Sequence, residues 1–443
     1  MHSCSRIVLV GLVLVTLVAC RTAAPLSPTD ALPAPERHVL DNGVRVVIQE
    51  HRTSAVVALQ LWVHAGGRDE SDTELGLSHY LEHMLFKGTT TRPPGSIHHA
   101  VEGVGGRINA STSYDFTYYH LVVPVDALDE GLAILADISV NAAFDPEELE
   151  REKLVVLEEM RRSEDDPRSY LARRLYALAF EGHPYGRPVL GTPEIIRSLT
   201  REALLRYYRA HYVPEAFTLV VVGSVDPAAV LKTTTRLFGS TPRSGVSRLP
   251  PSTPVFAAPR RLDVRRPGAH AYIGMAWPAP GLDHPDAPAL DLLSSILGET
   301  RSSRLNVTLR EGNGSVSRIG SSYVPLAAAG AVLVTAQLDP ANVDRVENEI
   351  LGEVRHVQTS GVTEAELRRA ITAVEAAYVF RNETAEGLGR SYGHAEAIWR
   401  LSDELAYVSR VRQVTREHVR DTARRILVLD RYARVALVPR RDS

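Results

Sequence analysis

Three polar residues in the first quarter of the chain, His79, Glu82 and His83, have the types and the spacing of a metal-dependent hydrolase. The stretch 76–88 around them contains no proline and no β-branched residue and ends at Gly88, so it predicts one short helix. On a helix, positions i, i+3 and i+4 project from the same face. Two imidazoles one turn apart suit a borderline metal such as zinc, and a carboxylate between them can reach a water molecule on that metal.

The same stretch has a second interpretation, as a plain amphipathic helix with a solvated polar face. Its other face is apolar and would anchor the helix in a core in either case; it consists of Leu77, Leu81, Met84 and Leu85. The order His-x-x-Glu-His is the inverzincin motif, the reverse of the commoner His-Glu-x-x-His. A five-residue pattern alone leaves both interpretations open.

Composition and charge exclude some classes of function. The chain has 443 residues, of which 44% are hydrophobic and 23% charged, and this is ordinary for a globular protein of two or three domains. Its formal net charge of −3 argues against a nucleic-acid-binding protein, because phosphate contacts need clustered positive charge.

The amino terminus predicts a lipoprotein signal peptide, residues 1–20. Arg6 precedes an apolar run, 7–19, that is too short for a typical membrane span and ends in Leu-Val-Ala before Cys20, as in a bacterial lipobox. Lipidation of Cys20 would anchor the protein in the bacterial cell envelope, facing the periplasm, and Arg21 in place of an aspartate favours the outer membrane. The alternatives are an ordinary secretory signal and an uncleaved anchor. Residues 21–36, rich in Pro, Ala and Thr, predict a flexible tether.

The rest of the chain divides into two similar halves. Residues 199–202 and the helix and strand after them match residues 414–417 onward without a gap. Residues 239–259 contain five prolines and several serines, which is the composition of a linker. We therefore expect a metal-binding domain at 37–238 and a homologous domain at 260–443. The second domain has no histidine in its corresponding helix, so only the first half could hold metal.

Two more segments of the first half bear on the site. Residues 105–112 form a polar, glycine-flanked stretch and are a candidate sheet edge that could pair with an extended peptide. Residues 146–162 predict a helix on which Glu152 and Glu159 lie seven apart, two turns along one face. Glutamates are mostly exposed in proteins, so these two could simply line a solvated surface.

Together these segments resemble the pitrilysin-type zinc peptidases, the insulinase-like family that includes insulysin and the mitochondrial processing peptidase. The resemblance covers about residues 37–440 and is strongest in the first half. The matching segments occur in the same order: 76–79 through 86–88, Asn109-Ala110 before Asp115 and Thr117, 150–152 through 158–159, and 183–185. The resemblance implies an α+β fold of two homologous halves, each a mostly antiparallel sheet with helices packed on it, arranged around a chamber. It also implies a zinc metalloendopeptidase that acts on extended or unfolded peptides.

The resemblance assigns metal-binding roles to individual residues. His79 and His83 resemble two zinc ligands, and Glu159 resembles the third. Glu152 resembles an outer carboxylate that orients the site. Three protein ligands leave a fourth position for water, whose pKa zinc lowers to ~7.

It also assigns the catalytic and substrate-binding groups. Glu82 would be the general base that takes a proton as hydroxide attacks the peptide carbonyl and later returns it to the leaving amine. Asn109 and Ala110 match the strand that holds the substrate extended beside the metal.

One departure from the family pattern concerns the second half, where single-chain active members supply an arginine and, seven residues later, a tyrosine that stabilise the oxyanion. Arg310 matches the arginine, but Ser317 stands in place of the tyrosine, and Tyr323 better matches a different aromatic residue. Some family members divide this work between two chains. We therefore expect this protein to be the metal-bearing subunit of a heterodimer, with the arginine–tyrosine pair on a second peptidase-like subunit.

Two other interpretations stay open. The missing tyrosine favours a non-catalytic, peptidase-like binding or assembly subunit, although a scaffold has no need of Glu82. An independently active oligopeptidase stays open if another residue replaces the tyrosine.

Overall fold

The structure is a computed structural model that describes residues 33–245, 248 and 259–440. The predicted signal peptide, Cys20 and most of the tether lie outside the described residues, as does much of the predicted linker, so lipidation stays a prediction. In the described part of the chain, every helix is either too short or too polar to span a bilayer.

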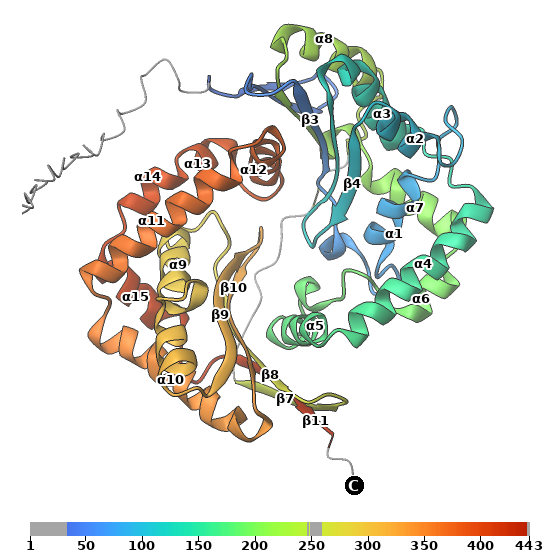
Figure 1. Cartoon of the computed structure of the whole chain (residues 1–443). Coiled ribbons are helices and arrows are strands. Elements are labelled where there is room, and N and C mark those ends of the chain that lie inside the picture. The colour runs from blue at the N-terminus through green and yellow to red at the C-terminus, as the bar shows by residue number, and fades with distance from the viewer. Residues whose placement is uncertain (1–32, 246–247, 249–258, 441–443) are drawn as a thin grey trace, which may run out of the picture. The chain divides into compact units, whose positions relative to one another are not determined.

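The first half is built on a six-stranded, mostly antiparallel sheet with the strand order β1-β2-β6-β3-β5-β4 (Figure 1). The turn between β1 and β2 contains Gly43, whose φ of 96° lies in the left-handed region that favours glycine. The strand β4 lies at the edge of the sheet, as its composition predicts. The bounds are β1 Glu36–Val39, β2 Arg45–Glu50, β3 Val56–Val63, β4 Arg107–Thr112, β5 Thr117–Pro124 and β6 Phe217–Gly223.

The second half repeats this plan on a five-stranded sheet with the order β7-β11-β8-β10-β9. In each sheet a parallel pair, β2–β6 or β7–β11, is followed by antiparallel strands. The repeated sequence segments correspond as well, because Thr200 and Thr415 both cap the helix that precedes the last strand of their half. The bounds are β7 Arg260–Arg266, β8 Ala271–Ala279, β9 Val316–Pro325, β10 Gly330–Leu338 and β11 Ala433–Pro439.

Helices pack on the sheets and enclose one large apolar core in each half. In the first half they are α1 Leu77–Leu85, α2 Ser96–Gly103, α3 Leu128–Val140, α4 Pro146–Asp165, α5 Pro167–Ala179, α6 Pro193–Ser198, α7 Arg201–His211 and α8 Pro227–Phe238. In the second half they are α9 Ala287–Ser294, α10 Val343–Ser360, α11 Glu364–Arg381, α12 Ala385–Ile398, α13 Leu401–Leu405, α14 Tyr407–Arg412 and α15 Arg416–Ile426.

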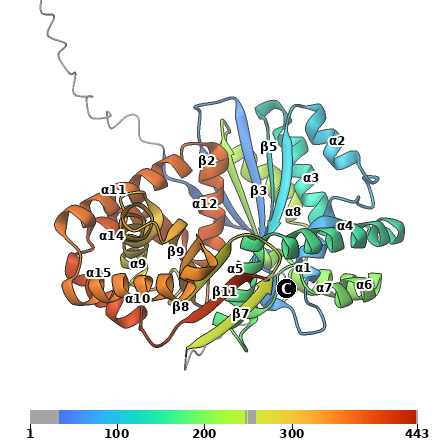
Figure 2. The same cartoon turned by 60° about the horizontal axis from the view of Figure 1, so that its bottom comes forward.

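One helix of each half packs on the sheet of the other half. The helix α5 packs on β8 and β11 of the second sheet through Leu171 and Leu175, and α12 packs on β3 and β6 of the first sheet through Leu388 and Tyr392 (Figure 2). Each sheet therefore has one face in the core of its own half and another face covered by the other half.

A buried polar network also joins the halves. Asp115, which is fully buried, accepts hydrogen bonds from the Tyr185 hydroxyl at 2.9 Å and from the Ala327 N–H at 3.0 Å. Arg68 pairs with the same carboxylate at 3.0 Å. Asp115 and Tyr185 belong to segments that resemble the family, and here they hold a loop of the second half against the first.

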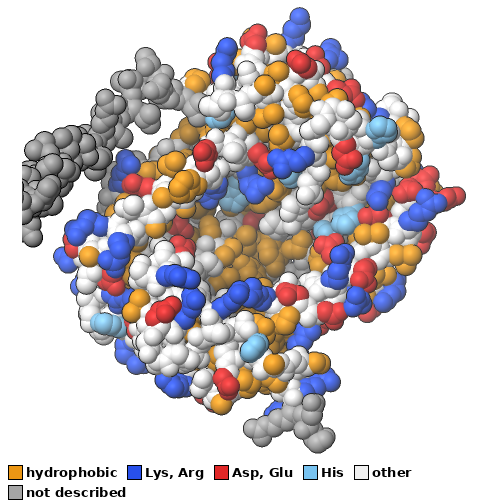
Figure 3. Space-filling view, in the orientation of Figure 1, with side chains coloured by type: hydrophobic (Ala, Val, Ile, Leu, Met, Phe, Trp, Pro, Cys, Tyr) orange, Lys and Arg blue, Asp and Glu red, His pale blue; other side chains and the backbone are white. Residues whose placement is uncertain are grey.

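The face of the molecule seen in Figure 3 is hollowed between the two halves, and hydrophobic side chains lie at the bottom of the hollow. Elsewhere on this face, basic and acidic side chains are interspersed. The predicted α+β fold of two similar halves around a chamber is confirmed.

The close approach of α12 to the first sheet depends on Gly393 and generates a prediction. A Cβ atom at this position would lie 1.9 Å from Nε1 of Trp62, and Trp62 is itself fully buried. We expect Gly393→Ala to lower the free energy of unfolding by about 1–3 kcal/mol, because the added methyl group forces the two elements apart. Denaturant titration measures the change.

The matched control is Gly352→Ala in α10, where an added Cβ meets nothing within 4 Å. This substitution should stabilise the helix by up to ~1 kcal/mol, because alanine has the higher helix propensity. Equal unfolding midpoints for the two variants would contradict the tight packing of α12.

Candidate active site

The position of α1 is fixed at its first turn and along one face. Gly76 precedes the helix with a φ of 92°, and the Glu70 carboxylate accepts the N–H groups of Gly76 at 2.8 Å and of Ser78 at 2.7 Å. Burial raises the pKa of Glu70 to about 8. The apolar face lies in the first core and consists of Leu77, Tyr80, Leu81, Met84 and Leu85. The polar side chains of α1 therefore lie on the side where the helix meets α4 and β4.

His79, His83 and Glu159 come together between α1 and α4. The Nε2 atoms of the two histidines lie 3.3 Å apart. Glu159 Oε2 lies 3.5 Å from His79 Nε2 and 3.6 Å from His83 Nε2. Zinc in tetrahedral coordination, with bonds of about 2.0–2.2 Å, requires ligand atoms roughly 3.3–3.5 Å apart, so these three residues fit a zinc ion. In the described residues, this is the one group of three or more His, Cys, Asp or Glu side chains close enough to share a metal.

A hydrogen bond to Glu152 turns the His83 ring toward this group. His83 Nδ1 donates to Glu152 Oε1 at 2.8 Å, and Lys87 Nζ binds Glu152 Oε2 at 2.6 Å. Burial alone would lower the pKa of His83, but the bond to Glu152 and the nearby carboxylates of Glu82 and Glu159 raise it. Although burial opposes them, the hydrogen bonds from His83 and Lys87 lower the pKa of Glu152. Glu152 therefore stays charged and can orient His83 as an outer partner of a metal ligand does.

The group is closed on one side and open on the other. Burial lowers the pKa of His79 to about 3, so its ring is neutral, and its Nδ1 is buried with no hydrogen-bond partner among the described residues. The exposed fraction of the side chain rises from 8% for His79 through 20% for His83 to 38% for Glu159. The group is therefore most accessible to solvent on the side of Glu159.

Glu82 is buried next to this group and is held by the end of β4. Thr112 Oγ1 donates a hydrogen bond to Glu82 Oε2 at 2.5 Å, and burial raises the pKa of Glu82. Neither Thr112 nor Lys87 stands out in the sequence as a site residue. Lys87 stands four residues after His83, a spacing that places two helical side chains on the same face, so a position near His83 could have been expected. No local pattern pairs Glu82 with Thr112, which lies 30 positions later.

Asn109 and Ala110 lie on β4, the edge strand. They pair with His120 and Tyr119 of β5, and the other side of β4 has no strand partner within the described sheet. The Ala110 N–H donates to Oδ1 of the exposed Asn109 side chain at 2.8 Å. Because Thr112 of the same strand contacts Glu82, a peptide added to this edge would run beside the candidate base.

The structure does not bring the predicted residue of the second half, Arg310, into contact with the metal group. Among the described contacts, neither Arg310 nor Ser317 reaches His79 or its neighbours, and the Ser317 hydroxyl donates to the Gln337 carbonyl at 3.0 Å. Tyr323 is not free either, since its hydroxyl donates to the Pro280 carbonyl at 2.7 Å.

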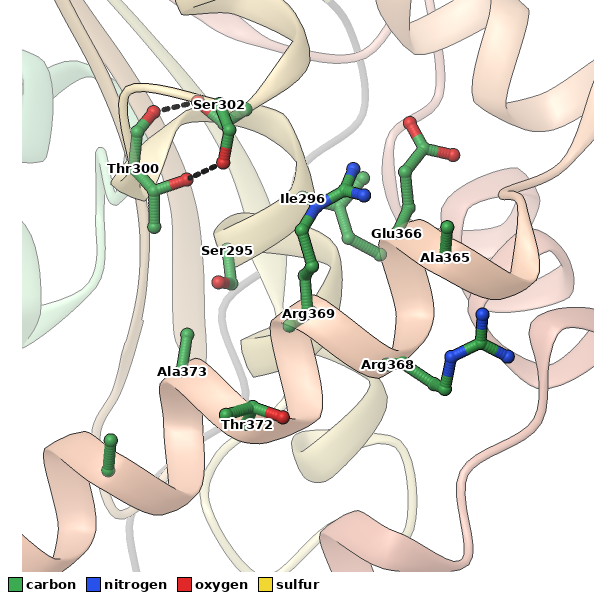
Figure 4. A pocket seen from close by; sticks show the side chains of 13 residues that line it. Ser295, Ile296, Thr300, Ser302, Ala365, Glu366, Arg368, Arg369, Thr372 and Ala373 are labelled. Atoms are coloured by element: carbon green, nitrogen blue, oxygen red, sulfur yellow. Dashed lines mark hydrogen bonds between the residues drawn. The ribbon is translucent and has the colours of Figure 1, made fainter. Parts of the chain in front are cut away.

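The second half has no carboxylates at the corresponding positions of its helix α11. In α4, Glu152 and Glu159 stand seven and fourteen residues after the N-cap, whereas the same positions of α11 are Ala370 and Ala377. A cavity of about 560 Å³ lies beside α11, and Figure 4 shows Arg369 and small side chains facing it. Within the described residues, metal-ligating side chains gather in the first half alone.

Comparison with known proteins matches both halves. Residues 45–193 match the model of insulinase (peptidase family M16), and residues 198–374 match the peptidase M16 inactive domain. An uncharacterised zinc protease of Mycobacterium tuberculosis is 32% identical over 429 residues, which cover 94% of this chain and 95% of that protein. A probable mitochondrial-processing peptidase subunit beta of Arabidopsis thaliana is 33% identical over 277 residues, which cover 60% of this chain and 51% of that protein.

Solved structures show the same fold. A protease from Helicobacter pylori has a TM-score of 0.87 at 25% identity, covering 92% of this chain and 100% of that one. A peptidase M16 inactive domain from Pseudomonas fluorescens has a TM-score of 0.86 at 18% identity, covering 93% and 99%. With both halves matched and a relative above 30% identity along nearly its whole length, the chain belongs to the insulinase family, peptidase family M16.

Proposed function

We propose that this protein is a zinc-dependent endopeptidase that hydrolyses extended or unfolded peptides. The observation that carries the proposal is the triangle of ligand atoms from His79, His83 and Glu159, with edges of 3.3, 3.5 and 3.6 Å, beside the buried carboxylate of Glu82. The zinc protease named among the relatives supports the same metal.

Each polar residue around the metal group has a separate task. Zinc held by His79, His83 and Glu159 would polarise the scissile carbonyl and acidify a water molecule. Glu82 takes the proton from the attacking water and then gives it to the leaving amine. Burial raises the pKa of Glu82, which suits a group that must accept and release a proton near neutral pH. Thr112 binds one carboxylate oxygen of Glu82 and leaves the other free for the water.

The free edge of β4 selects the form of the substrate. A peptide that pairs with this edge must be extended, because main-chain hydrogen bonds to a strand require strand geometry. The bond between Ala110 N–H and the Asn109 side chain would give way to a bond with the peptide. A folded protein offers few such segments, so unfolded chains and peptides are the substrates that fit.

The role of Glu82 can be separated from metal binding by two substitutions. We expect Glu82→Gln to retain zinc and to lower kcat at least ~100-fold, because it removes the general base and leaves the ligands in place. His83→Ala should lose both zinc and cleavage. Metal analysis and a quenched-peptide assay measure the two properties.

The matched control for these variants is Glu158→Gln, which changes an exposed carboxylate on α4 next to Glu159. It should keep zinc and activity. Wild-type cleavage by the Glu82→Gln variant would show that another group is the base.

The bond between Thr112 and Glu82 gives a further prediction. Thr112→Val keeps the shape of the side chain and removes the donor, and we expect kcat to fall roughly tenfold or more, since a hydrogen bond to a charged group contributes about 1.5–3 kcal/mol. Zinc content should not change. Thr112→Ser, which keeps the hydroxyl, should retain most of the activity. Equal rates for the valine and serine variants would mean that Glu82 needs no donor.

We propose further that a second subunit completes the active site. Ser317 stands where a tyrosine is expected, and the Tyr323 hydroxyl is already bound to the Pro280 carbonyl. The Arabidopsis relative is named as one subunit of a peptidase, which supports a divided active site. A non-catalytic role fits less well, because it gives no task to the buried pair of Glu82 and Thr112.

An active site shared between two subunits predicts different rates of peptide cleavage for the isolated chain and for the complex. The purified chain should cleave a quenched peptide on the order of a hundredfold more slowly than the complex recovered with a tagged chain from its own host. Arg310→Ala should leave the rate of the complex unchanged. Equal rates for chain and complex would favour an independent oligopeptidase, and zinc binding without cleavage in either preparation would favour an assembly subunit.

A further inference from the structure

A second polar cavity, of about 380 Å³, lies in the second half and shares no residue with the metal group. It lies where α9, α11, α12, α13 and α14 meet the end of β9. Its size is within the usual range for small-molecule sites. Acidic, basic and aromatic side chains line it together, chiefly Asp291, Arg381, Arg390, Trp399, Glu404 and Tyr407.

Two carboxylates in this cavity form no direct ion pair among the described residues. Glu404 is 8% exposed and Asp291 is half-buried, and neither forms an ion pair or a side-chain hydrogen bond within the described residues. Burial raises the pKa of each to about 7, and the charge of Arg381, which acts on both carboxylates, offsets the effect of burial only in part. His394 supplies no positive charge, because burial lowers its pKa to about 4. Buried carboxylates without partners are costly, so a cationic group would stabilise this end of the cavity.

Two buried donors beside the same cavity have no acceptor. The hydroxyl of Tyr407, a residue that is 6% exposed, and Nε1 of Trp399 have no hydrogen-bond partner in the described part of the chain. Their rings meet edge-on, with centroids 5.8 Å apart. Both donor atoms are buried from solvent, so they lie behind the wall of the cavity and are not among the groups that a ligand contacts.

The charges are arranged in layers from the rim inward. Arg381 and Arg390 are exposed, whereas Glu404 and Asp291 lie deeper. Arg381 forms no direct ion pair among the described residues, and its charge acts on both carboxylates from farther away. A simple cation would have to pass two guanidinium groups, and a simple anion would meet two carboxylates. A molecule that carries both charges matches both layers.

We propose that this cavity binds a small zwitterion, a free α-amino acid or a dipeptide, with its ammonium group at Asp291 and Glu404 and its carboxylate at Arg381. Both kinds of molecule carry the two charges on one short frame and are products of peptide hydrolysis. The site does not depend on catalysis, because none of its residues belongs to the metal group.

Thermal shift and calorimetric titration of the full chain test the proposal, with the twenty amino acids and a panel of dipeptides as probes. We expect at least one probe to raise the thermal midpoint in a concentration-dependent manner. Its N-acetylated and amidated forms, which lack one charge each, should not. Asp291→Asn and Glu404→Gln should weaken binding about tenfold or more, because each removes a charged partner. Comparing amino acids with dipeptides identifies the source of the zwitterion.

Two controls keep the result independent of folding and of peptidase activity. Arg381→Gln keeps a polar side chain and removes only the positive charge, so it should weaken binding in a chain that still holds zinc. Glu364→Gln, on the exposed start of α11, should bind like wild type. Binding of the amidated form as tightly as the free acid would reveal a plain cation site, and no binding by any probe would show that the cavity is not a ligand site; either result overturns the proposal.

Discussion

Burial of imidazole and carboxylate groups on the wall of an apolar core is the constraint on which the active site depends. Such groups are stable there only when each has a partner. The partners come from distant elements: Glu152 of α4 for His83, Thr112 of β4 for Glu82, and Glu159 of α4 opposite both rings. Because α1 cannot shift without leaving one of these groups unpaired, the contacts that prepare a metal site also fix the packing of α1 against α4 and β4.

The duplication explains how the site is kept rigid. Each sheet presents one face to its own helices and the other to a helix from the opposite half, α12 or α5. Gly393 lets α12 lie directly against Trp62, and Asp115 ties the first half to a loop of the second. Segments that resemble the family outside the metal motif thus include residues whose task is to join the halves, and a shift between the halves would disturb β3 and β5, on which β4 is built.

Local elements and their faces could be predicted from the sequence, whereas contacts between distant elements could not. The helix around His79 follows from the absence of breakers, and the edge position of β4 from its polar composition. Helical periodicity places Glu152 and Glu159 on one face, but only the family resemblance indicated that this face meets the histidines. The exchange of α5 and α12 and the bond from Thr112 to Glu82 have no periodic signal, because packing at long sequence separation decides them.

The second half shows that this fold and its metal chemistry are separable. Its sheet, core and helix caps remain where α11 carries alanines in place of the two glutamates, so the ligands are not needed for the packing that surrounds them. Asp291 and Glu404 are different, because they lie in or beside the core without a direct ion pair, and sequences violate the rule of paired polar groups mainly where function requires it. Each half therefore has one polar site within an otherwise apolar frame: the first has side chains that could hold a metal, and the second is the proposed site for a ligand that carries both charges.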